Sequence, residues 1–181
     1  MKSIIKIIST LFVFAFIVSA CDSSVSLQKY IVDSKENDEF MSIDLPASIL
    51  QLKETEVSTE IQNTLKTIKK VNLLALQVTD ANKELYNSEK IKVKNILKNS
   101  KYQQLMRVKM MGANVTVNFL GEDEAIDEVV IFAADDEKGF GIIRVLGENM
   151  NPSDILTLSQ NLKLDGDSSE MKQLEGIFSS L

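Results

Sequence analysis

The stretch Val-Asn-Leu-Leu-Ala-Leu-Gln-Val at residues 71–78 decides the expected fold. It is a nearly continuous apolar run that is short for a helix and has polar residues on both sides. Such a run predicts a strand that is buried on both faces in the middle of a sheet. The other strands and the covering helices are expected on either side of it in the sequence.

Three helices and one strand are predicted around this run. Apolar residues at helical spacing predict helices over about residues 25–32, 57–70 and 85–99, the second with Ser58 as its N-cap. Phe40, Ile43 and Leu45 predict a strand that ends at Pro46. The outer face of the third helix bears a stripe of lysines, which we interpret as a solvated face: Lys90, Lys92, Lys94 and Lys98.

The C-terminal half changes to a period of two, which is typical of half-buried strands. Four segments with this alternation predict an antiparallel meander: residues 106–110, 115–119, 126–134 and 140–146. Gly112-Ala113 is the expected two-residue turn of the first hairpin. Asn151 is the expected N-cap of a further helix that has Pro152 in its first turn.

These elements predict an α+β domain with two layers: a mixed sheet with the C-terminal four-strand antiparallel meander, and helices packed on one face. The expected domain covers residues 27–164. Residues 165–181 form either a docked terminal helix or a tail.

The N-terminus has the pattern of a secretory signal peptide. Lys2 and Lys6 precede a twelve-residue apolar stretch, Ile7–Val18, which is shorter than the roughly 20 residues of a membrane-spanning helix. Val18-Ser19-Ala20-Cys21 resembles the bacterial lipobox, and Cys21 is the only cysteine of the chain. We therefore expect residues 1–20 to be removed, Cys21 to be acylated, and residues 21–26 to form a short leash.

Lipidation predicts a protein that is held at a bilayer through acylated Cys21. No acidic cluster follows Cys21, and we therefore expect the protein to face the periplasmic side of the bacterial envelope. Removal of residues 1–20 changes the formal net charge from −6 to −8, because Lys2 and Lys6 are lost. This net acidity argues against nucleic acid as a ligand and against binding to an anionic lipid surface. The expected partner is another protein of the envelope.

Three segments resemble the DUF4252 family, small lipoproteins of the Bacteroidota whose function is not established. They are Lys-Tyr-Gln-Gln-Leu-Met at 101–106, Ile-Asp-Glu-Val-Val-Ile at 126–131, and Val-Leu-Gly-Glu-Asn-Met-Asn-Pro-Ser-Asp-Ile at 145–155 with the closing Leu158. The resemblance implies an exported, lipidated α+β domain. It supplies no active-site residues.

Composition excludes several kinds of catalytic site. The 181 residues include no His and one Cys, so the chain alone cannot form a Ser-His-Asp or Cys-His triad or a His or Cys metal cage. We expect no metal site and no cofactor. Acidic clusters occur at 122–124, 135–137 and 165–167, but none has EF-hand spacing, and we interpret them as solvated turns.

Arg144 is unusual, because strand alternation places it on the same face as Phe140, Ile142 and Leu146. We interpret it as a buried, paired arginine, with an anion or partner contact as the alternative. The expected function is a non-enzymatic binding or regulatory module of the envelope. The alternatives are a hydrolase that uses carboxylates and a carrier of a small molecule or lipid.

Overall fold

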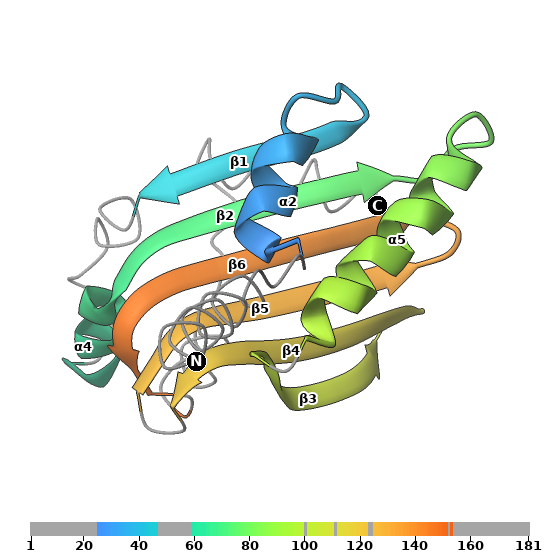
Figure 1. The fold of residues 1–181 in the computed structure, drawn as a ribbon. Helices are drawn as coiled ribbons and strands as arrows, with labels where there is room; N and C mark the ends of the chain where they lie inside the picture. Colours follow the sequence, from blue (N-terminus) through green and yellow to red (C-terminus); the bar gives the residue numbers. More distant parts are fainter. Residues whose placement is uncertain are drawn as a thin grey trace, which may run out of the picture.

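The computed structural model describes residues 25–46, 59–99, 101–110, 112–122, 125–151 and 153. The expected signal peptide, Cys21 and the segment 165–181 lie outside these ranges. The described elements are α2 (Leu27–Ser34), β1 (Phe40–Pro46), α4 (Thr59–Thr67), β2 (Ile68–Gln77), α5 (Lys83–Leu97), β3 (Gln103–Met110), β4 (Ala113–Glu122), β5 (Ala125–Asp135) and β6 (Gly139–Met150). The expected α+β class is confirmed, with one six-stranded sheet in the order β1-β2-β6-β5-β4-β3 (Figure 1).

The sheet is antiparallel throughout, so the expectation of a mixed sheet is wrong. All five neighbouring pairs run in opposite directions. A parallel pair forms when a helical crossover returns the chain to a nearby strand in the same direction. Here α5 leads from β2 to β3 at the far edge of the sheet. The chain then returns through the consecutive pairs β3–β4, β4–β5 and β5–β6, and β6 pairs with β2.

β2 contains all but the last residue of the apolar run 71–78. Residues 72–76 are buried without interruption, so this strand is buried on both faces as predicted, and it lies between β1 and β6. The predicted helix before it is too long, because α4 ends at Thr67 and residues 68–70 belong to β2. Ile68 is buried at the start of β2, and the last turn of a helix would also have buried it. Its apolar side chain therefore did not distinguish a helix from a strand.

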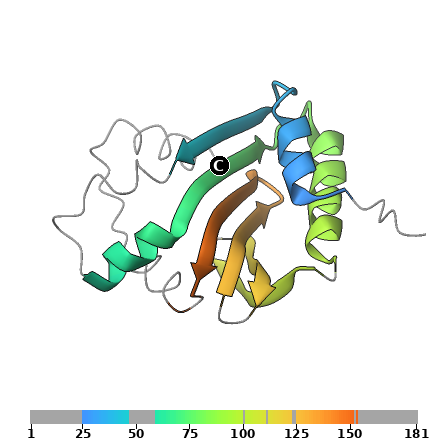
Figure 2. The same cartoon turned by 60° about the vertical axis from the view of Figure 1, so that its left-hand side comes forward.

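Helices α2 and α5 lie side by side over one face of the sheet (Figure 2). Ser26 begins α2 as its N-cap, since its hydroxyl accepts a hydrogen bond from the backbone N–H of Lys29 at 3.2 Å. Phe140 is at the centre of the core beneath the helices, with ring centroids 5.8 Å from Phe132 and 6.0 Å from Tyr86. Burying each such ring contributes roughly 1.5–3 kcal/mol.

Helix α4 lies at the end of the sheet and not beside α2 and α5 (Figure 1). Its Leu65 belongs to a second buried cluster that includes Val129, whereas the next residue of β5, Val130, belongs to the core under α2 and α5. Successive residues of a strand point to opposite faces, so β5 is buried on both. The prediction that all the helices pack on one face of the sheet is therefore wrong for α4. None of the helices in the described ranges is long and apolar enough to cross a bilayer.

Two predicted turns can be compared with the structure. Met110 pairs with Ala113, so the residues between β3 and β4 are 111 and 112, one position earlier than predicted. Gly112 has φ +92°, a conformation that glycine adopts without steric cost. Asn151 has the side-chain contact expected of an N-cap, because its Oδ1 accepts the N–H of Ser153 at 2.9 Å. The predicted helix beyond Ser153 lies outside the described residues.

Candidate functional site

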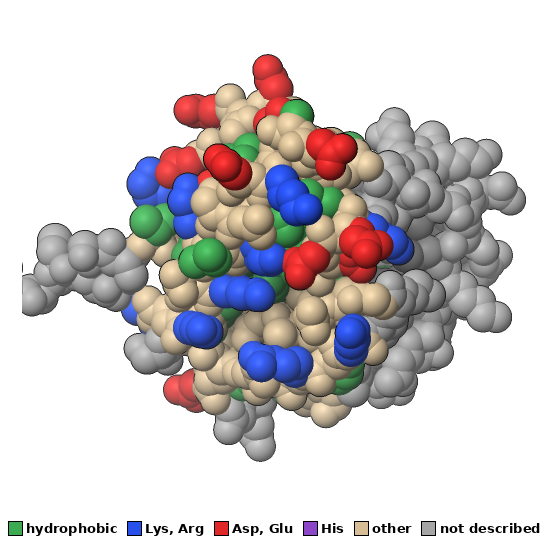
Figure 3. All heavy atoms as spheres, turned by 90° about the vertical axis from the view of Figure 1, so that its right-hand side faces the viewer, with side chains coloured by type: hydrophobic (Ala, Val, Ile, Leu, Met, Phe, Trp, Pro, Cys, Tyr) green, Lys and Arg blue, Asp and Glu red, His purple; other side chains and the backbone are tan. Residues whose placement is uncertain are grey.

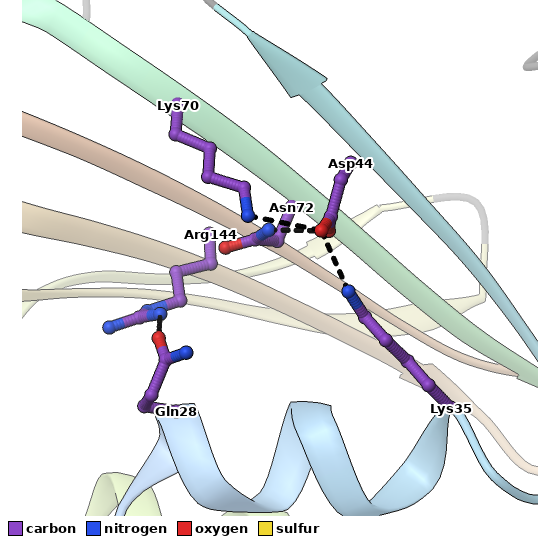
Figure 4. A network of polar contacts seen from close by, with 6 residues as sticks. All are labelled: Gln28, Lys35, Asp44, Lys70, Asn72 and Arg144. Carbon is purple, nitrogen blue, oxygen red and sulfur yellow. Dashed lines mark hydrogen bonds and ion pairs between the residues drawn. The ribbon is translucent and has the colours of Figure 1, made fainter.

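Arg144 of β6 lies at the centre of a buried polar network beneath α2. Its side chain is buried, and Nη2 donates to Oε2 of Glu128 on β5 at 2.6 Å. On the helix side, Nη1 donates to Oε1 of Gln28 in α2 (Figure 4). Arg144 therefore joins the helix layer to two neighbouring strands of the sheet.

Glu128 is the residue that balances the charge of Arg144, and it is only 3% exposed. Its other oxygen, Oε1, accepts a hydrogen bond of 2.8 Å from the hydroxyl of Tyr102, which lies just before β3. Burial first, and then the Glu128 carboxylate, raise the pKa of Tyr102 above its usual range. The phenol therefore stays protonated and remains the donor in this contact.

Sequence reasoning singled out Arg144 but missed Glu128. A usable signal was present, because Glu128 has the same strand parity as Val130 and Phe132, which are buried in the core under the helices. Asn72 gives a similar signal, since it has the parity of Leu74. A buried arginine needs a carboxylate partner, and alternation identifies Glu128 as a candidate.

The second part of the network is centred on Asp44 of β1. Asn72 pairs in register with both Asp44 and Arg144, and its Nδ2 donates to Oδ1 of Asp44 at 2.6 Å. Lys35 and Lys70 donate to Oδ2 at 2.7 and 3.0 Å (Figure 4). Partial burial raises the pKa of Asp44, but these three hydrogen bonds outweigh it and lower the pKa to about 2.

This shift predicts part of the acid sensitivity of the protein. The folded-state pKa of Asp44 is below its usual value of 3.8, so its stabilising contribution is present above about pH 4 and is lost as the pH falls towards 2. In Asp44→Asn we expect a shallower fall in the free energy of unfolding over this range. Urea denaturation at several pH values measures it. Asp33→Asn removes one carboxylate from an exposed pair and is the matched control. Equal slopes in Asp44→Asn and the native chain would contradict the contacts described.

The network is suited to holding elements together. The positive charge of Arg144 is already matched by Glu128 at 2.6 Å, so an anionic ligand would have to displace a buried carboxylate. Nε of Arg144 is buried and has no hydrogen-bond partner in the part of the chain that the structure describes. The geometry therefore favours the interpretation of Arg144 as a paired structural residue.

The acidic turn at residues 135–137 also has a structural arrangement. Oδ1 of Asp135 accepts the N–H of Glu137 at 2.8 Å, which closes the β5–β6 turn. Oδ1 of Asp136 accepts hydrogen bonds from Lys90 at 2.6 Å and from the hydroxyl of Tyr86 at 3.0 Å. The hydrogen bond from Lys90, followed by that from Tyr86, lowers the pKa of Asp136. The carboxylate of Asp135 therefore closes the turn, and that of Asp136 fastens it to α5.

The other acidic clusters give no further site among the described residues. Within those ranges, no group of three or more His, Cys, Asp or Glu side chains is placed to hold a metal ion. Glu122 is exposed at the end of β4. Asp123, Glu124 and the segment 165–167 lie outside the described residues.

A cavity of about 290 Å³ lies where the start of α2 meets α5. Its lining is mostly apolar, with Val25, Tyr30, Lys92, Asn95, Ile96 and Asn99 around it. Ligand pockets usually have volumes of about 300–1,000 Å³, so this cavity is at the small end of that range. Burial first, and then the Glu89 carboxylate, raise the pKa of Tyr30.

All three tyrosines of the chain are expected to resist ionisation. The pKa values of Tyr30, Tyr86 and Tyr102 are each raised mainly by burial. A raised folded-state pKa stabilises the protein below about pH 10, and this contribution is lost as the pH rises beyond that value. We expect little tyrosinate absorbance until the protein unfolds, and then a cooperative rise. A spectrophotometric titration checks this without interference from Trp, which the chain lacks. A gradual rise centred near pH 10 in the folded protein would contradict it.

The fold and the network define an α+β domain built on an antiparallel sheet, with its described buried charges paired inside it. The family described as "Domain of unknown function (DUF4252)" matches residues 30–158, which is more than half of the chain. The chain therefore belongs to the DUF4252 family. No curated protein and no solved structure matches it.

Proposed function

We propose that this protein is a lipid-anchored component of the bacterial cell envelope, facing the periplasm, that acts by binding another envelope protein. The signal-peptide pattern of residues 1–20 and the lipobox-like Val18–Cys21 support the anchor. The first residue of α2, Leu27, is six positions after Cys21. The domain would therefore be held close to the membrane by a short leash.

One observation supports a binding role in particular: the buried charges are used within the fold. Arg144 is bonded to Glu128, and the buried Glu89 accepts a hydrogen bond from Lys92 at 2.5 Å. A catalytic acid or base must reach the reacting group of a substrate, and these side chains are occupied by one another. The arrangement supports a rigid scaffold that presents a surface.

The two alternatives have weaker support. A carboxylate-dependent hydrolase would use acids such as Asp135 and Asp136, but both make contacts that close or dock the β5–β6 turn. The lowered pKa of Asp136 favours the ionised form, which cannot act as a general acid. A carrier would need an internal space, and the cavity beside α2 is small for a lipid.

The test begins with the mass and location of the mature chain in cells. We expect an N-terminal Cys21 that bears acyl chains and a membrane-bound protein, whereas a Cys21→Ser variant should not be acylated. Crosslinking in intact cells, followed by mass spectrometry, should then capture a reproducible partner with the native chain and much less of it with Cys21→Ser. An unmodified Cys21, or a folded and anchored chain that captures no partner, would contradict the proposal.

A second variant separates binding from hydrolysis. Asp135→Asn, Asp136→Asn and Glu137→Gln in one chain remove three carboxylates at the turn. If the chain remains folded and its effect in the cell is unchanged, the turn has no catalytic role. Loss of that effect from a folded variant that still binds the partner would favour the hydrolase.

A further inference from the structure

Positive charge is concentrated in one segment of this acidic chain. Residues 83–110 contain eight Lys and Arg side chains and two carboxylates, whereas the rest of the chain contains twelve and twenty-four. The segment includes α5 and β3. The net charge of −6 for the whole chain therefore conceals a strongly basic region.

Helix α5 presents this charge on its outer side. The helix buries Tyr86, Glu89, Val93, Ile96 and Leu97. Lys90, Lys94 and Lys98 are spaced four residues apart and so form one ridge along the helix. Figure 3 shows Lys and Arg side chains gathered over much of the face on which α5 lies, with Asp and Glu towards its upper part. We call the lysines of α5 and of its C-cap the basic face: Lys83, Lys90, Lys92, Lys94 and, at the C-cap, Lys98.

Part of the basic face is not neutralised within the described structure. Lys90 is paired with Asp136 at 2.6 Å, and its side chain is only 14% exposed. Lys94 and Lys98 are exposed, and no carboxylate of the described residues lies within ion-pair distance of either. Like charges at i and i+4 on a helix repel each other. An anionic surface against the ridge would relieve that repulsion.

The start of α2 places the expected anchor beside this face. Val25 lines the cavity together with Lys92 and Asn95 of α5, so the chain enters the fold next to that helix. Cys21 is four residues before Val25, and four residues span at most about 14 Å. Val25 and Ile91 are also exposed apolar side chains, at 48% and 56%. Exposed apolar groups among lysines are typical of surfaces that lie at a membrane interface.

We infer that the basic face rests against the anionic headgroups of the membrane in which Cys21 is anchored, an inference that rests on the proposed lipid anchor. The acidity of the whole chain does not oppose this contact. Charges act over about 8 Å at physiological salt, so the membrane responds mainly to the face that is held against it. The expectation that net acidity disfavours an anionic lipid surface applies to the whole chain and not to this face.

Lysine labelling on vesicles tests the orientation. The full chain is produced with its leader, extracted from membranes, and reconstituted in vesicles of phosphatidylcholine alone or of an equal mixture with phosphatidylglycerol. Acylation of each lysine by an amine-reactive reagent is then measured by mass spectrometry. We expect labelling of Lys94 and Lys98 to be on the order of fivefold slower on the anionic vesicles, and the protection to disappear at high salt. Lys66 of α4, at the opposite end of the sheet in Figure 1, is the internal reference.

Matched variants show whether the ridge itself is responsible. Lys94→Gln with Lys98→Gln should remove the protection of Lys92, whose side chain is 60% exposed, on anionic vesicles. Lys69→Gln with Lys70→Gln changes the net charge equally, keeps the reference Lys66 and should retain the protection. Equal labelling on both kinds of vesicle would overturn the inference. So would protection in intact cells that is absent on vesicles, because an acidic protein would then cover the face.

The same samples distinguish this inference from the proposed anchor. The mass of the N-terminal peptide shows whether Cys21 bears acyl chains. An acylated chain whose lysines are labelled equally overturns only the orientation. A chain without acyl groups overturns both.

Discussion

Replacing Glu128 by Gln is expected to lower the free energy of unfolding by about 3–5 kcal/mol. The substitution keeps the shape of the side chain but removes the charge that balances Arg144 at 2.6 Å. Arg144 is 6% exposed, so water cannot solvate the remaining positive charge. Urea denaturation followed by circular dichroism measures the change from the shift in the midpoint.

Two further variants are controls for the Glu128→Gln result: one removes both buried charges, and the other breaks an exposed ion pair. Glu128→Leu combined with Arg144→Met removes both charges and should recover much of the loss, because a buried ion pair is often replaceable by apolar side chains. Asp33→Asn breaks the exposed pair with Lys29 and should cost no more than about 0.5 kcal/mol. A Glu128→Gln variant as stable as Asp33→Asn would show that Arg144 is not held in a dry core.

Much of the fold was predictable because local patterns and the final packing agree. The alternation of residues 126–134 and 140–146 corresponds to β5 and β6, whose residues under α2 and α5 are buried as that period requires. The first helix and the strand that ends at Pro46 also lie where predicted. In each case the spacing of apolar residues within one element is sufficient to show which of its residues face the core under α2 and α5.

The errors occur where a residue is buried for reasons that lie elsewhere in the chain. Ile68 fits the apolar side of a helix, but the structure uses it in β2, where it pairs with Gly147. Gly147 lies far along the chain from Ile68, so the local spacing of apolar residues cannot reveal that the two residues pair. The antiparallel direction of the sheet has the same origin, because it depends on where α5 delivers the chain and not on the composition of any strand.

The polar network was only half predictable for a related reason. Arg144 was noticed because a charge on an apolar face is unusual, whereas its partner Glu128 lies sixteen positions away on the neighbouring strand. Pairing of Val130 with Arg144 brings the two side chains together, and that register is a property of the whole β5–β6 hairpin. Net charge is likewise a property of the whole chain, because it averages the basic face with acids that lie on other elements.

The same hairpin contains the position where a single methyl group should be most damaging. Gly139 begins β6 with φ +133°, and a Cβ there would collide with the carbonyl oxygen of Leu76 and lie 2.9 Å from Cα of Gln77. We expect Gly139→Ala to lower the free energy of unfolding by about 3 kcal/mol, since strain and steric overlap act together. Gly141 is two residues further along the same strand and has open space where its Cβ would lie, so Gly141→Ala should change the stability little. Urea denaturation of both variants compares the same added methyl group at two places in β6. Equal stability of the two would mean that β6 does not approach β2 as closely at Gly139 as the pairing of Gly139 with Gln77 requires.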